Sequence, residues 1–172
     1  MIHEEIETAI NAQINQELTA AHTYLGMAAH FDELNLNGFS RWMSLQADEE
    51  REHADRLFRY LLDRGGKVRL GAIPAPDFET GNHVKLFELA LAQEEANTKS
   101  INELYELATT LNDHATKSHL QWFIDEQVEE EASIDEILGH LKLAGQDTAA
   151  LLYLNDKLGQ RQPGSGDGPE GA

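Results

Sequence analysis

The chain has 172 residues, enough for one domain, and its 31 acidic and 13 basic residues give a formal net charge of −18. This charge argues against binding to nucleic acid or to an anionic membrane surface, because both require a basic face. Cysteine is absent, which excludes disulfides and iron–sulfur clusters, and the lack of a long apolar run or of a signal-peptide core predicts a cytoplasmic protein without membrane spans.

Apolar residues recur every three or four positions along most of the chain, which is the spacing of one face of an α-helix. Two long stretches are free of helix breakers, because the only prolines are Pro74, Pro76, Pro163 and Pro169. The pattern predicts an all-α fold with four long helices and one short helix, over about residues 3–33, 38–64, 82–111, 115–144 and 147–158. Asp147 is expected to cap the start of the short helix.

The connections between these helices predict their arrangement. The turns near residues 34–37 and 112–114 are short, so each joins two antiparallel neighbours. The link over 65–81 contains glycine and proline and is long enough to run the length of a bundle, which would leave the second and third helices parallel. We therefore predict a four-helix bundle with a long crossover over residues 1–145, a short fifth helix over 146–159, and a disordered, glycine-rich tail over 160–172.

Polar residues interrupt the apolar stripe at the middle of each long helix. They are Glu17 in the first helix, Glu50 and His53 in the second, Glu94 in the third, and Gln127 and Glu130 in the fourth. Helices of similar length place their midpoints at one depth, so these side chains are expected to meet in the core. Four buried carboxylates are very costly unless cations neutralise them. The pattern predicts a site for two divalent ions such as iron, manganese or zinc, and the alternative is a buried acid–histidine network without metal.

Over about residues 3–158 the sequence resembles the ferritins, and among them the haem-free bacterial ferritins. The resemblance is carried by Glu17 with Tyr24 seven positions later, the segment 49–53, Gln93 with Glu94, and the segment 121–131. It implies a ferritin-like bundle in which Glu17, Glu50 and His53 bind a first iron ion. It also implies that Glu94, Glu130 and the bridging Glu50 bind a second iron ion, with Gln127 close by.

In bacterial ferritins a third iron site lies beside this pair, and the resemblance places it at Glu49, Glu126 and Glu129, with Glu130 shared. The alternative for these three residues is an exposed acidic face. The sequence differs, however, from that of the haem-binding relatives. Bacterioferritins carry a second Glu-x-x-His on the fourth helix, where this chain has Gln127 and Glu130. They also carry a haem-binding methionine inside the first motif, where this chain has Arg51. No haem is therefore expected.

The resemblance implies iron storage with ferroxidase activity, in which Fe(II) is oxidised by O₂ or peroxide and stored as ferric mineral. Tyr24 would donate an electron or hydrogen-bond a ligand, although a core tyrosine explains it equally well. The implied assembly is a homo-oligomeric shell of 24 subunits, with the fifth helix packed around its fourfold axes. A di-metal oxidase or peroxidase that does not store iron, and a metal-free helical scaffold, remain alternatives.

Overall fold

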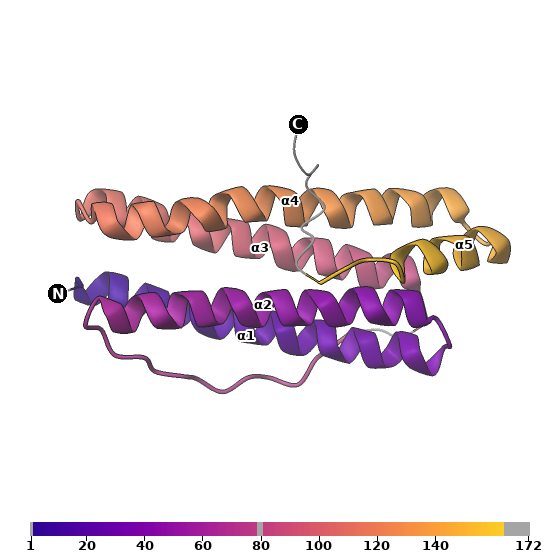
Figure 1. Ribbon diagram of the computed structural model, residues 1–172, viewed down its shortest axis with the longest axis horizontal. Coiled ribbons are helices and arrows are strands. Elements are labelled where there is room, and N and C mark those ends of the chain that lie inside the picture. Colours follow the sequence, from indigo (N-terminus) through magenta and orange to yellow (C-terminus); the bar gives the residue numbers. More distant parts are fainter. Residues whose placement is uncertain (1, 79–80, 164–172) are drawn as a thin grey trace.

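The computed structural model describes residues 2–78 and 81–163, which form four long helices in a bundle and a short fifth helix at one end (Figure 1). The helices are α1 Glu4–Glu33, α2 Asn37–Asp63, α3 His83–Thr110, α4 His114–Ala144 and α5 Thr148–Leu158. Each boundary lies within one residue of the predicted one, and no strand occurs among the described residues. The predicted all-α bundle is confirmed. None of the described helices is both long and apolar enough to cross a membrane.

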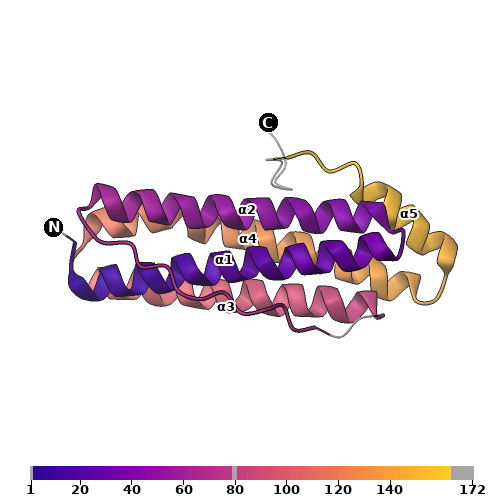
Figure 2. The same cartoon turned by 90° about the horizontal axis from the view of Figure 1, so that it is seen from below.

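The long link sets the topology of the bundle. Short turns make α1 and α2, and likewise α3 and α4, antiparallel, and the turn residues Asn35 and Asn112 take the left-handed backbone conformation that asparagine tolerates. The link follows the outside of α1 from one end of the bundle to the other, so α2 and α3 are parallel (Figure 2). Asn11 of α1 holds its first part, donating to the carbonyl of Lys67 at 2.9 Å and accepting from the amide of Arg69 at 2.5 Å.

Side chains satisfy the free amides at the helix starts, as helix ends require. Asp147 accepts hydrogen bonds from the amides of Ala149 and Ala150, which confirms it as the cap of α5. The residue before α2 supplies no side-chain cap. Asn155 of α5 replaces it, because its Oδ1 accepts from the amide of Gly38 at 2.8 Å. The short helix α5 is thereby tied to the start of α2.

The apolar core is divided into two clusters along the bundle axis. One includes Phe31, Trp42 and Phe87, and the other includes Ile10 and Leu57, each with further apolar neighbours. The buried charged side chains, Glu17, Glu50, Glu94 and Glu130, lie near the middle of the four helices, between the residues of the two clusters. The core is therefore interrupted at one depth, as the sequence pattern predicts.

Part of the predicted disordered tail is described by the structure. Residues 164–172 of that segment lie outside the described residues, whereas residues 160–163 lie inside them. Within this short stretch the side chain of Arg161 packs against α2, with its guanidinium carbon 5.1 Å from the ring centre of Trp42. The ordered structure thus extends past the end of α5.

Candidate metal centre

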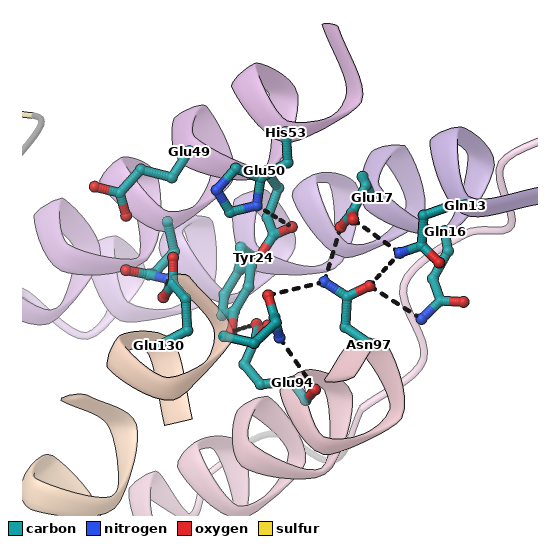
Figure 3. Close-up of polar contacts among 12 residues, drawn as sticks. Gln13, Gln16, Glu17, Tyr24, Glu49, Glu50, His53, Glu94, Asn97 and Glu130 are labelled. Carbon is teal, nitrogen blue, oxygen red and sulfur yellow. Dashed lines mark hydrogen bonds and ion pairs between the residues drawn. The ribbon is translucent and has the colours of Figure 1, made fainter. Parts of the chain in front are cut away.

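Four carboxylates and one imidazole converge where the two apolar clusters are separated (Figure 3). Helix α1 supplies Glu17, α2 supplies Glu50 and His53, α3 supplies Glu94, and α4 supplies Glu130. None of these five residues is more than 5% exposed. The structure therefore brings together the residues that the sequence predicts for the two central metal ions.

Glu50 is the residue that most clearly lacks protein partners. Neither of its carboxylate oxygens, nor Nδ1 of His53, makes a hydrogen bond among the described residues, although all three atoms are buried. Nδ1 of His53 and Oε2 of Glu50 make a close polar contact with each other, at 3.5 Å (Figure 3). Ligand atoms of Glu17, Glu50 and His53 all lie within 4.8 Å of one another. Since buried polar atoms nearly always have a partner, this group of unpaired oxygen and nitrogen donors fits a metal ion.

The imidazole of His53 is in the form that binds metals. Burial, with a smaller contribution from the nearby Arg56 guanidinium, lowers the pKa of His53 to about 4. The ring is consequently neutral at physiological pH and keeps a lone pair for coordination. Trp122 and Phe123 pack edge-on against the ring, at centroid distances of 5.4 and 6.0 Å, and fix its orientation.

The carboxyl groups of the centre have raised pKa values in the absence of metal. Burial raises the pKa of Glu17 to about 7 and that of Glu130 to about 8. Burial and the neighbouring carboxylates of Glu94, Glu17 and Glu130 together hold the pKa of Glu50 well above its usual range. Protons therefore occupy part of this centre when cations do not, and metal binding must release them.

The second half of the centre is formed by α3 and α4. Tyr24 is fully buried and donates its hydroxyl hydrogen bond to Oε1 of Glu94. Gln127 donates to the main-chain carbonyl of Glu94 at 3.3 Å and lies 3.4 Å from its Oε2. Glu130 accepts a 2.6 Å hydrogen bond from Nε2 of Gln46. Tyr24 and Gln127 thus both lie beside Glu94, and Tyr24 hydrogen-bonds one of the predicted ligands.

Two buried amides that the sequence analysis missed hold Glu17 in place (Figure 3). Gln13 donates to Oε1 of Glu17 at 2.8 Å, and Asn97 donates to Oε2 of Glu17 at 3.0 Å and to Oε1 of Gln127 at 3.2 Å. Helical spacing could have identified these two amides in the sequence. Gln13 precedes Glu17 by one helical turn, and Asn97 follows Glu94 by three residues, so each lies on the same helix face as a buried acid. Gln46 has the same relation to Glu50, one turn before it.

The residues predicted for a third metal ion differ in burial and in their partners. Ligand atoms of His53, Glu126 and Glu130 lie within 4.8 Å of one another, and Glu126 is half-buried. Glu49 lies on the same side of the centre as Glu130 (Figure 3). It is paired with Arg161, at 2.8 Å between Oε2 of Glu49 and Nη2 of Arg161. Glu129 is exposed. No sequence signal linked Arg161 to this site, since it lies 112 positions after Glu49.

Comparison with protein families agrees with this geometry. A model of the ferritin-like domain matches residues 7–144. Bacterial non-heme ferritins of Staphylococcus saprophyticus and Staphylococcus aureus are 40% and 37% identical over 161 residues, which is 94% of this chain and 96–97% of theirs.

Solved structures give the same result. An open-pore ferritin from the hyperthermophilic archaeon Archaeoglobus fulgidus superimposes with a TM-score of 0.92 at 44% identity, covering 94% of this chain and 100% of that one. A structure described as a humanized archaeal ferritin also has a TM-score of 0.92 and 44% identity. With four converging carboxylates, a neutral histidine and relatives of this similarity over nearly its whole length, the chain belongs to the ferritin family.

Proposed function

We propose that this chain is an iron-storage protein with ferroxidase activity. Fe(II) is its substrate, oxidised at a di-iron centre within each subunit by O₂ or peroxide and stored as ferric mineral. Glu17, Glu50 and His53 bind one ion, and Glu94 and Glu130 bind the other, with Glu50 as the bridge. Gln127 lies close to the second ion. The observation that carries the proposal is the pair of buried carboxylate oxygens of Glu50 that make no hydrogen bond among these ligands.

The chemistry follows from the ligand set. Carboxylates are hard donors and stabilise Fe(III) more than Fe(II), which favours oxidation. Two ions held about 3.5–4 Å apart can each give one electron to the same oxidant. The balanced step is 2 Fe(II) + O₂ + 2 H⁺ → 2 Fe(III) + H₂O₂, and carboxyl protons displaced from the centre are available for it. The neutral Gln127 adds no charge to hold Fe(III), which suits an ion that leaves and hydrolyses to mineral.

Storage also requires an enclosed assembly, and we infer a cytoplasmic homo-oligomeric shell of 24 subunits. Support comes from family membership and from apolar side chains that the single chain leaves uncovered near its C-terminal end. Leu143 of α4 is 86% exposed and Tyr153 of α5 is 75% exposed. Exposed apolar side chains grouped in this way mark a protein–protein interface more often than a free surface.

Iron loading of matched variants tests the proposal. Glu50→Gln keeps the size of the bridging side chain but removes its charge, whereas Glu52→Gln makes the same change at an exposed position of the same helix. We expect the wild type and Glu52→Gln to oxidise Fe(II) in air and to retain far more than three iron ions per chain. Glu50→Gln should lose the two central ions and slow oxidation about 100-fold or more, in line with the cost of removing a catalytic group.

The same experiment separates the alternatives. A small oligomer that turns over peroxide and holds only two ions per chain would favour the non-storage oxidase or peroxidase. Metal binding that is absent, or equal in Glu50→Gln and the wild type, would favour the metal-free scaffold and would contradict the proposal.

A further inference from the structure

Arg161 is a buried cation beside the metal centre that comes from outside the four-helix bundle. It follows α5, and its side chain is only 7% exposed. Its carbonyl accepts hydrogen bonds from Nε and Nη2 of Arg41 at 3.3 and 3.2 Å, which fixes the main chain against α2. The face of Trp42 lies under the guanidinium. Arginine is rarely buried without a partner that uses its charge, so its partners indicate what it does.

Both partners of the guanidinium belong to the centre or contact it. Nη2 lies 2.8 Å from Oε2 of Glu49, and Nη1 donates to Oε1 of Gln46. Gln46 in turn donates from Nε2 to Oε2 of Glu130 at 2.6 Å. One guanidinium therefore binds Glu49, a carboxylate proposed for the third metal ion, directly, and it reaches the shared Glu130 through a single amide.

The guanidinium and a third metal ion would compete for the carboxylate of Glu49. Glu49 and Glu130 lie on one side of the centre in Figure 3, opposite Gln13 and Asn97. Burial, with the Glu126 and Glu52 carboxylates, raises the pKa of Glu49, and Arg161 opposes this rise by favouring the charged carboxylate. The positive charge of Arg161 thus does at Glu49 what a metal ion would do there.

We propose that Arg161 is a positioning residue that occupies Glu49 in place of the third metal ion, so that this ion binds only when the segment after α5 leaves α2. The inference rests on the proposed function, because it takes Glu49 as a ligand of the third ion. Binding of the ion and docking of Arg161 exclude each other, and such coupling is reciprocal. Removal of Arg161 should therefore strengthen binding of the third ion, and binding of the third ion should release Arg161.

Binding of Zn(II) measured by calorimetry tests the first consequence without any oxidation step. Arg161→Ala should bind the third ion about tenfold more tightly than the wild type, within the ~5–150-fold range of typical couplings. Its two central ions should be unchanged. Arg161→Lys, which keeps the charge, should stay close to the wild type. Arg59→Ala, which removes an exposed arginine of α2, should have no effect. Arg161→Ala combined with Glu49→Gln should lose the gain.

Fluorescence of Trp42 tests the second consequence. The chain has two tryptophans, so Trp122→Phe leaves Trp42 as the sole reporter of the guanidinium beside it. The third equivalent of Zn(II) should change this emission, and the change should be absent when Arg161→Ala is added.

The outcomes distinguish this inference from the proposed function. If Arg161→Ala leaves the third ion unchanged, weaker or absent while two Glu50-dependent ions still bind, the inference is wrong and the proposed function stands. A purely structural arginine gives that result, because its loss lowers stability without improving any metal site. If the wild type binds no Zn(II) at all, both are wrong.

Discussion

The side-chain amide of Asn97 donates a 3.0 Å hydrogen bond from Nδ2 to Oε2 of Glu17 in the closed centre of the bundle. The same Nδ2 lies 3.2 Å from Oε1 of Gln127, and Oδ1 accepts a hydrogen bond from Gln13. Helices α1, α3 and α4 are therefore connected through one buried amide. Glu17 is held in a fixed orientation before any metal ion arrives, which reduces the ordering that metal binding requires.

Replacement of Asn97 by leucine should weaken the proposed metal site that contains Glu17. Leucine has a similar size but offers no hydrogen, so Glu17 would lose one of its two amide donors. Loss of such an outer partner typically lowers metal affinity ~10–100-fold. Calorimetry with Zn(II) should show this loss for the first ion, while Asn102→Leu, an exposed position of the same helix, should match the wild type. Equal affinities for both variants would show that Asn97 only fills space.

Replacement of Tyr24 by phenylalanine should affect both stability and oxidation. The tyrosine hydroxyl is the hydrogen-bond donor to Oε1 of Glu94, and a buried acceptor that loses its donor costs about 1–3 kcal/mol. The melting temperature of the metal-free protein should fall by several degrees, and Fe(II) oxidation should slow. Tyr153→Phe, at an exposed position of α5, provides the control. If oxidation is unchanged while the melting temperature falls, Tyr24 is a structural residue alone.

The raised pKa of Glu130 predicts how the stability of the metal-free protein depends on pH. Its pKa is about 8 in the folded protein against an ordinary value of 4.5, so between these values the folded chain binds a proton that the unfolded chain has released. The free energy of unfolding should therefore fall as pH rises from about 5 to 8. Glu130→Gln removes this titration and should melt progressively higher than the wild type across that range.

Adding Zn(II) at pH 8 should reverse the order of the two melting temperatures, so that the wild type melts higher than Glu130→Gln. The metal ion replaces the proton in the wild type and stabilises the folded state by its binding energy, whereas Glu130→Gln has lost a ligand. A difference between the two proteins that does not change with pH would contradict the assignment of the raised pKa to Glu130.

The elements that could be predicted from the sequence are those set by local pattern. Helix bounds followed from apolar spacing and from the positions of proline. The convergence of Glu17, Glu50, Glu94 and Glu130 followed from helix length, because helices of similar length align their midpoints. Gln13 and Asn97 have the same helical spacing from buried acids. They were not predicted because glutamine and asparagine are uncharged, so their position in an apolar stripe is less unusual than that of a glutamate.

Contacts across long separations in sequence could not be predicted in this way. Arg161 reaches Glu49 only because α5 turns back along the end of the bundle, and the direction of that turn depends on packing rather than on periodicity. Composition gave no sign of this contact, since the glycine-rich stretch around Arg161 is typical of a disordered tail. The contact between α5 and α2 is therefore the feature for which the structure added most.

The contact between α5 and α2 depends on the absence of a side chain at Gly38. A Cβ atom at this position would lie 1.7 Å from the main-chain oxygen of Asn155, so α5 approaches α2 too closely for any side chain. The amides of Gly38 and Phe39 also point to Oδ1 of Asn155, at 2.8 and 3.3 Å. Gly38→Ala should push α5 away and remove this cap, at a cost of about 1 kcal/mol for the cap alone.

Gly139→Ala is the matched control with the opposite expected sign. A Cβ atom there meets nothing within 4 Å, and alanine inside a helix is more favourable than glycine by about 1 kcal/mol. Thermal melting should thus show a lower transition for Gly38→Ala and an unchanged or higher one for Gly139→Ala. Because Arg161 follows α5, Gly38→Ala should also tighten binding of the third Zn(II) ion, as Arg161→Ala does. A Gly38→Ala protein with wild-type stability would show that α5 does not need this close approach.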